Sequence, residues 1–519
     1  MNPPAISHPP RLFRRVRSAL PAGLFLLANL LTATAAERPA AAPVVELGSR
    51  LELFFDDYLI EQMSGLRVQL NHPQSAGTVI TFDQPWEGNV SWPLSVFKDG
   101  EIYRMYYMGR SAPDYVRTTG LEPDEAVVPE HPDFYCYAES KDGITWVKPS
   151  LGLVEFNGSK ENNIVADAGV VFLDTNPATP TAERYKAVKG NGSVPMWPKN
   201  LQAEPKGMYL AVSSDGLNWK RWKEGFLLQS GLPNAFDSIN VMFWSEAEQQ
   251  YVYYMRFMDH HVRSFARATS KDLVNWTVPE PVSFGDAPME HLYTNAATPY
   301  FRAPNITLGF PKRYVPLRKR HEDQRIPGIS EAGFMATRDG HNWKLFGEPF
   351  IPPGRDDRNW IHRTTSTSVG IIPTAEDEIS LFVERHYTMP SNHMERFVIR
   401  TDGFTSVHAD ATGGEFVTKP FNFTGDTLVL NYATSASGSI QVEVLDVRGH
   451  PIPGFELQRS IPLWGDEISG VVRWDRPANG WTDPLKVSEL AEKPIRLRFV
   501  LKNADLYSLQ FRTTETPKP

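Results

Sequence analysis

The stretch Ser140-Lys141-Asp142-Gly143-Ile144-Thr145-Trp146 returns several times along this chain, and this repeat decides the fold. The Asp side chain can accept backbone N–H groups within a turn, and Gly permits the positive φ that the tight position needs. Each copy therefore predicts a turn between two strands, with the Trp opening the second strand. The further copies are Ser214-Asp215-Gly216-Leu217-Asn218-Trp219, Ser270-Lys271-Asp272-Leu273-Val274-Asn275-Trp276, Thr337-Arg338-Asp339-Gly340-His341-Asn342-Trp343 and, without a Trp, Arg400-Thr401-Asp402-Gly403-Phe404.

A second repeat lies upstream of the first and gives the number of units. Tyr103-Arg104-Met105-Tyr106-Tyr107-Met108-Gly109-Arg110 resembles Tyr251-Val252-Tyr253-Tyr254-Met255-Arg256, and a further apolar run precedes each of them. The resulting order is three strands, an Asp turn and a fourth strand, five times over. A propeller blade of four strands takes about 40–50 residues. The sequence thus predicts an all-β chain with a five-bladed β-propeller at residues 86–419.

The segments that flank the predicted propeller have patterns of their own. Residues 1–36 have the layout of a secretory signal peptide, with four arginines, an apolar stretch and small residues up to Ala36. We therefore expect export to the periplasm or the extracellular space, and no membrane attachment once the signal is cleaved. Residues 44–85 are predicted to lead into blade one. The alternating pattern of residues 420–513 predicts a small C-terminal β-sandwich.

Bulk composition narrows the class of protein further. The formal net charge of −8 argues against a nucleic-acid partner, because no basic surplus is present to neutralise phosphates. Cys136 is the single cysteine, so no intrachain disulfide can form, and stability must come from core burial. These properties leave the oligomeric state open.

These repeats resemble the five-bladed glycoside hydrolase superfamily that includes invertases, arabinanases and β-xylosidases. More closely, Phe55-Asp56-Asp57-Tyr58-Leu59-Ile60 and Asn157-Gly158-Ser159-Lys160-Glu161-Asn162-Asn163 look like secreted propeller proteins of environmental bacteria. The invertase hallmark Trp-Met-Asn-Asp-Pro-Asn-Gly is absent, and Trp86-Glu87-Gly88-Asn89 stands at the comparable place. The resemblance implies a central funnel that holds an acid, a base and a third carboxylate.

Four acidic residues lie where the strands should converge on that funnel. Glu87, Asp237 and Glu290 come just before first strands, and Glu384 ends the second strand of blade five. Glycoside hydrolysis needs one protonated carboxyl and one ionised carboxylate, so Asp237 and Glu290 are predicted to be catalytic, with Glu87 or Glu384 completing the set. Which of them is acid and which is base is left open.

A cation stands at the end of the second strand in every predicted blade. Exposed basic residues are usually just solvated, but a cation at the same place in all five copies predicts paired contacts to the carboxylate or sulfate of an anionic sugar. Tyr293 is added as a stacking surface. The predicted binding residues are Arg110, Arg256, Lys312, Arg313, Tyr293, His362, Arg363, Arg385 and His386, with Lys189 in blade two.

The sequence thus predicts an exported glycoside hydrolase that acts on a polysaccharide or oligosaccharide, with an anionic substrate as a further hypothesis. A carbohydrate-binding propeller without catalysis and a sialidase-like enzyme are the alternatives. No metal site is predicted, since His260-His261 should point to opposite sides of a strand and His321-Glu322-Asp323 falls in a charged loop. No cofactor is expected, although the resemblance allows a calcium ion in the central channel.

Overall fold

The computed structural model describes residues 43–113, 129–190, 207–322, 324, 326–475, 487–491 and 493–513. These residues belong to one compact unit, Pro43–Pro519. The predicted signal peptide at residues 1–36 lies outside the described residues. In the part of the chain that is described, no helix has the length and apolar character needed to cross a membrane.

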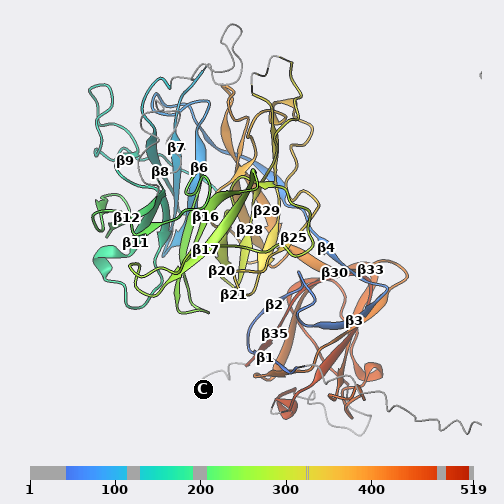
Figure 1. Cartoon of the computed structure of the whole chain (residues 1–519). Helices are drawn as coiled ribbons and strands as arrows, with labels where there is room; N and C mark the ends of the chain where they lie inside the picture. Colours follow the sequence, from blue (N-terminus) through green and yellow to red (C-terminus); the bar gives the residue numbers. More distant parts are fainter. Residues whose placement is uncertain are drawn as a thin grey trace, which may run out of the picture. The chain divides into compact units, whose positions relative to one another are not determined.

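Five sheets share one antiparallel pattern, in which most neighbouring strands also follow each other in the chain (Figure 1). The predicted fold class, an all-β chain with propeller sheets, is confirmed. The first sheet contains β6 (Trp92–Asp99), β7 (Ile102–Gly109), β8 (Phe134–Ser140) and β9 (Ile164–Val165), and the second contains β10 (Val170–Leu173), β11 (Tyr185–Gly190), β12 (Gly207–Ser213), β13 (Lys220–Arg221) and β14 (Leu228–Gln229). The third contains β15 (Val241–Ser245), β16 (Gln250–Asp259), β17 (Val262–Ser270) and β18 (Glu280–Pro281), and the fourth contains β20 (Thr298–Tyr300), β21 (Ala303–Gly309), β24 (Met335–Thr337) and β25 (Lys344–Leu345). The fifth contains β26 (Ser366–Thr367), β27 (Ile372–Pro373), β28 (Glu378–Arg385), β29 (His393–Arg400) and β5 (Gln74–Thr81).

The Asp turns form as the repeat predicts. Asp142 accepts the backbone N–H groups of Ile144 and Thr145 at 2.8 and 2.7 Å, and the Ser140 hydroxyl donates to the same carboxylate. In the second copy the hydroxyl comes from Ser213, one residue before Ser214, at which the sequence pattern placed the start of this copy. The turns at Asp215, Asp272 and Asp339 repeat the two backbone bonds.

These turns should make the protein labile to acid. Burial raises the pKa of Asp215, but hydrogen bonds from Asn218 and Leu217 outweigh it and lower the pKa to about 2. A folded-state pKa below the unfolded value of about 3.9 stabilises the protein above that value, and this stability is lost as the pH falls towards 2. We expect the free energy of unfolding, from urea titrations, to fall in this window and to fall less steeply in Asp215→Asn. An unchanged slope would contradict the expectation.

Tyrosines of the second repeat connect neighbouring sheets through these turns. The Tyr106 hydroxyl donates to the carbonyl oxygen of Gly216 at 2.8 Å, and the Tyr254 hydroxyl donates to that of Gly340 at 2.7 Å. Gly216 has φ +81°, and a Cβ at this position would lie 2.7 Å from the Tyr106 hydroxyl oxygen. The turn and the tyrosine motif therefore form one repeated joint between sheets.

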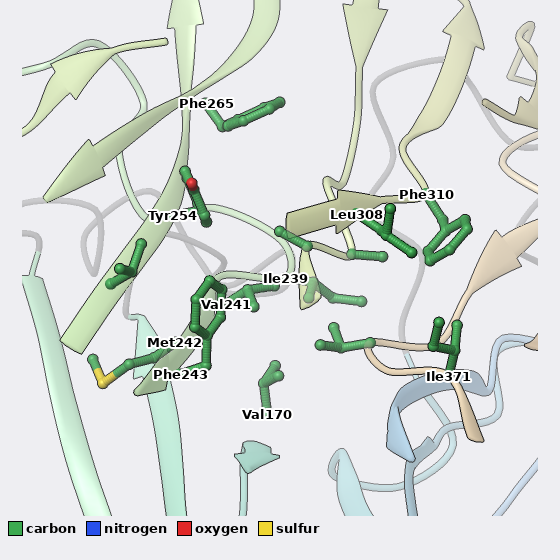
Figure 2. Close-up of a cluster of buried hydrophobic side chains, with 14 of the residues drawn as sticks. Val170, Ile239, Val241, Met242, Phe243, Tyr254, Phe265, Leu308, Phe310 and Ile371 are labelled. Atoms are coloured by element: carbon green, nitrogen blue, oxygen red, sulfur yellow. The ribbon is translucent and has the colours of Figure 1, made fainter. Parts of the chain in front are cut away.

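The sheets close into a ring where the first of them meets the last. Ser95 of β6 bridges to Val369, which precedes β27, and the N-terminal strand β5 pairs with β29 as the outer strand of the last sheet. Apolar side chains from different sheets then share one core. Figure 2 shows part of it, including Val170, Leu308 and Ile371.

A further sheet holds most of the C-terminal strands and takes strands from both sides of the predicted domain boundaries. It contains N-terminal strands that the sequence assigned to the lead-in, and β30 and β31, which fall within the predicted propeller range. Its strands are β2 (Glu52–Leu53), β3 (Ile60–Ser64), β4 (Arg67–Leu70), β30 (Thr405–Ala409), β31 (Gly414–Thr418), β33 (Thr427–Leu445), β34 (Asp466–Val471) and β35 (Arg496–Arg512), while β1 (Val45–Gly48) pairs with β32 (Phe421–Phe423). The short 3-10 helices are η1 (Thr181–Glu183), η3 (Asp357–Asn359), η4 (Leu457–Arg459) and η5 (Val487–Leu490).

The fifth copy of the repeat connects the propeller sheets to this C-terminal sheet. Asp402 is fully buried and accepts hydrogen bonds from the Tyr300 hydroxyl at 2.5 Å and from the Ser508 hydroxyl at 2.7 Å. Arg302 forms an ion pair with it at 2.9 Å, and Asn431 donates to it at 3.2 Å. This copy therefore serves as a joint between two parts of the fold, and it has no Trp.

Candidate functional site

A small three-stranded sheet carries two of the predicted binding residues, Lys312 and Arg313, at the end of the propeller sheets opposite the Asp turns. It consists of β19 (His291–Leu292), β22 (Lys312–Val315) and β23 (Ile329–Ala332). His291 pairs with Tyr314 and Leu292 pairs with Arg313. Side chains alternate along strands, so Lys312 and Tyr314 lie on one face of this sheet and Arg313 lies on the other.

Four cations surround the half-buried side chain of Tyr293. The guanidinium carbons of Arg263, Arg256 and Arg363 lie 4.7, 4.9 and 5.4 Å from the centre of its ring, and the Lys312 Nζ lies 5.7 Å from it. The Lys312 ammonium also donates to the backbone oxygen of Arg363 at 2.7 Å. We call these five residues the Tyr293 cluster. Four positive charges thus converge on one aromatic ring.

The cluster shifts the pKa values of its own members. Burial raises the pKa of the Tyr293 phenol, but the charges of Arg363, Arg256 and Arg263 outweigh it, so the pKa lies below its ordinary value. Burial lowers the pKa of Arg256 to about 10, which still leaves it charged at neutral pH. Burial also lowers the pKa of Lys312, against the opposing effect of Glu384.

Two of the four predicted catalytic carboxyls lie at this cluster, in different surroundings. Asp237 forms an ion pair with Arg256, and a third of its side chain is exposed. Glu384 is fully buried near Lys312; burial raises its pKa, and the charge of Lys312 opposes this only in part. Its Oε1 accepts a bond from the Thr364 hydroxyl at 3.3 Å, whereas its buried Oε2 has no hydrogen-bond partner among the described residues.

Two histidines at the border of the cluster are neutral at neutral pH. Burial and then the charge of Arg263 lower the pKa of His291, and burial and then Arg363 hold the pKa of His362 well below its ordinary value. His362 Nδ1 lies 2.9 Å from the backbone oxygen of Pro327, and its ring contacts Tyr314.

Backbone strain accumulates beside the same cluster. Phe236 and Ser238, on either side of Asp237, have φ of 63° and 62°, and Arg363 and Thr365 have φ of 59° and 66°. Non-glycine residues in this left-handed region cost free energy and are concentrated at functional sites. The strain thus coincides with the charged groups.

The structure does not bring Glu87 and Glu290 to the cluster. Glu87 is buried between Lys148, at 2.7 Å, and the Tyr107 hydroxyl, at 2.6 Å. Glu290 forms an ion pair with Arg313 at 2.9 Å, on the face of the small sheet turned away from Tyr293. Both carboxylates therefore have structural partners, and so does Arg313.

The remaining predicted cations also have partners of their own. Arg110 forms an ion pair with Asp133 at 3.2 Å, and Lys189 forms one with Asp167 at 3.2 Å. Arg385 forms an ion pair with Glu395 at 3.2 Å and donates to the backbone oxygen of Pro353. His386 contacts Asp356 at 2.9 Å. The predicted ring of five cations thus consists of separately paired residues, and Arg256 and Lys312 are the two that reach Tyr293.

Arg263 is the cluster residue that the sequence analysis missed. It stands near the start of the third strand β17, whereas most of the predicted cations stand at the ends of second strands. A second strand and the following third strand are antiparallel, so the end of one and the start of the other share an edge, and this rule would have found it. His260 and His261 were expected within a strand, but they form the turn between β16 and β17, with φ of 45° and 68°.

Metal ligands do not gather at this site. Within the described ranges there is no group of three or more His, Cys, Asp and Glu side chains arranged to hold a metal ion. His321 contacts Asp357, and Asp323 of the same run lies outside the described residues.

Comparisons with known proteins find similar structures but no family. No protein-family model and no curated protein matches this chain. An endo-arabinase from Bacteroides thetaiotaomicron has 11% identity and a TM-score of 0.37, covering 62% of this chain and 97% of its own. A fructofuranosidase from Schwanniomyces occidentalis has 12% identity and a TM-score of 0.37, covering 83% of this chain and 97% of its own. An exo-inulinase from Aspergillus awamori has 13% identity and a TM-score of 0.35, covering 83% of this chain and 99% of its own.

The three structures are named for enzymes that act on carbohydrates. Their TM-scores lie below 0.5, so the chemistry of the site rests on the residues of this chain.

Proposed function

We propose that this protein is an exported glycoside hydrolase that binds an anionic sugar, uronic or sulfated, at the Tyr293 cluster. The observation that carries the proposal is the convergence of Arg256, Arg263, Arg363 and Lys312 on one tyrosine. Guanidinium groups bind carboxylate and sulfate through paired, charge-assisted hydrogen bonds. The Nε of Arg263 is buried and has no acceptor among the described residues, so it is available to such a group.

The two carboxyls at the cluster fit the division of work in glycoside hydrolysis. One carboxyl must hold a proton for the leaving oxygen, and an ionised group must act on water or on the anomeric carbon. Glu384 fits the acid, because its pKa is raised and its Oε2 has no hydrogen-bond partner in the part of the chain that the structure describes. The ionised groups beside it at the cluster are candidates for the second role, and Asp237 is the carboxylate among them.

A carbohydrate-binding propeller without catalysis is the second candidate. It is favoured by Glu87 and Glu290, whose ion pairs remove them from the predicted catalytic set. Incubation with a panel of sulfated and uronic polysaccharides, followed by detection of new reducing ends, separates the two candidates. Binding with release of reducing ends supports the hydrolase, and binding without release of any supports the second candidate.

The anionic-substrate proposal makes a matched prediction for two arginines. A charge-assisted hydrogen bond contributes about 1.5–3 kcal/mol, so Arg256→Ala should weaken binding of an acidic oligosaccharide by about 10- to 150-fold. Arg313→Ala should leave binding unchanged, because Arg313 lies on the opposite face of β22 from Lys312. Calorimetric titration with acidic and neutral oligosaccharides measures both. Equal losses for acidic and neutral sugars in Arg256→Ala would refute an anionic substrate.

A further inference from the structure

We propose that Tyr293 is the catalytic base of this hydrolysis and acts as a phenolate, while Asp237 positions Arg256. This inference rests on the proposed function and deepens it, because it assigns the second catalytic role to a residue that the sequence placed among stacking groups. The feature behind it is a phenol ring with four cations within 6 Å of its centre.

The charged groups that face Tyr293 come from every element packed against it, and nearly all are positive. Arg256 comes from β16, Arg263 from β17, Lys312 from β22 and Arg363 from the segment before β26. An ionised phenolate would offset their mutual repulsion, whereas a neutral phenol would leave four like charges together in a half-buried place.

The neighbouring titratable groups do not cancel this effect. His291, His362 and Tyr314 border the ring, and both histidines have lowered pKa values and are neutral. The negative groups are Asp237, which is paired with Arg256, and Glu384, whose pKa burial raises to about 7, so that a large fraction of it stays protonated at neutral pH. The balance of charges lowers the pKa of Tyr293 despite its burial.

Asp237 is less suited to the role of base than its position suggests. Its carboxylate is in direct contact with the Arg256 guanidinium. Taking a proton there would leave Arg256 without its counter-ion, in a place where burial already disfavours its charge. Asp237 is therefore a positioning residue, whose ion pair keeps Arg256 beside the ring of Tyr293.

The step balances with one water molecule. The Tyr293 phenolate oxygen takes a proton from water, and the water oxygen forms a bond to the anomeric carbon. The bond from that carbon to the glycosidic oxygen breaks, and Glu384 delivers its proton to the departing oxygen. The Tyr293 proton then passes through solvent to Glu384, which restores both groups and leaves one water molecule consumed.

Ultraviolet titration tests the ionisation of Tyr293 without any substrate. The spectrum of the native protein minus that of Tyr293→Phe should show a phenolate that forms below the ordinary tyrosine value of about 10. The signal is readily isolated, because burial raises the pKa of buried tyrosines such as Tyr106, Tyr107 and Tyr253. The same difference for Tyr253→Phe should show no phenolate in that range, because burial raises the pKa of Tyr253 well above its ordinary value. Ionisation of Tyr293 at or above the ordinary value would overturn the proposal.

A positioning variant and kinetics complete the test. Arg263→Gln removes one cation and should move the Tyr293 titration to higher pH.

In reducing-end assays, Tyr293→Phe should lower kcat by about 10²–10⁴-fold and remove one limb of the bell-shaped pH profile, whereas Asp237→Asn should keep both limbs. If Asp237→Asn loses the limb and Tyr293→Phe keeps it, the base is Asp237 and the hydrolase proposal stands. If the native protein cleaves no acidic polysaccharide, both proposals fail, even if the titration shows a phenolate.

Discussion

Glu384→Gln is expected to lower the turnover of an acidic polysaccharide by about 10²–10⁴-fold while the protein stays folded. Gln keeps the size of Glu384 and can still accept the hydrogen bond from Thr364, but it has no proton to give to the leaving oxygen. Initial rates of reducing-end formation give the loss, and one limb of the pH profile should disappear with it. Urea titration of the same sample shows that folding is retained.

A matched control lies on the same strand. Glu378 stands at the other end of β28, where it binds Thr374 and Arg396, and Glu378→Gln should leave turnover within a factor of about two, since it removes no proton donor from the site. If Glu384→Gln retains native turnover, then Glu384 is not the acid, and the carbohydrate-binding alternative gains.

Asp402→Ala should cost about 3–5 kcal/mol in the free energy of unfolding, because breaking a buried ion pair leaves the other charge uncompensated. The change removes the acceptor of Tyr300 and Ser508 and the counter-ion of Arg302. Chemical denaturation monitored by tryptophan fluorescence measures the loss.

The exposed turn residue Asp339 provides the comparison for Asp402. Asp339→Ala removes the two backbone bonds of an Asp turn at the surface, and its cost should be about 1 kcal/mol. Equal costs for the two variants would show that the fifth copy is an ordinary turn and not a joint to the C-terminal sheet.

The turns were predictable because their cause is local. An Asp and a hydroxyl residue within three positions are enough to satisfy the backbone N–H groups of the turn, so the repeat revealed the meander directly. The pairing partners of β2, β3 and β4 were not predictable in this way. They pair with β30, β31 and β35, hundreds of residues away, and no periodicity within residues 44–85 marks that partnership.

For the candidate site, the positions of residues along the strands were predictable, but the faces to which their side chains point were not. Strand ends place Arg256, Lys312 and Glu384 at the correct edge, and Tyr293 and Arg363 were found beside them. The face of the sheet to which a side chain points, however, changes with every residue along a strand, and the sequence did not reveal the small sheet that contains β19 and β22. Arg313 and Glu290 were therefore placed on the same side as Tyr293, whereas they pair with each other on the opposite face.

The pairing of β5 with β29 has a consequence for how this protein is made. Ser75 and Glu395, which touch across that pair, are 320 residues apart in the chain. A ribosome that adds about 5–20 residues per second leaves β5 without its partner for roughly 15–60 s. During that time a strand edge and the open side of a half-built ring are exposed to other nascent chains. The emerging polypeptide should therefore be a strong client for chaperones until residue 400 has been synthesised.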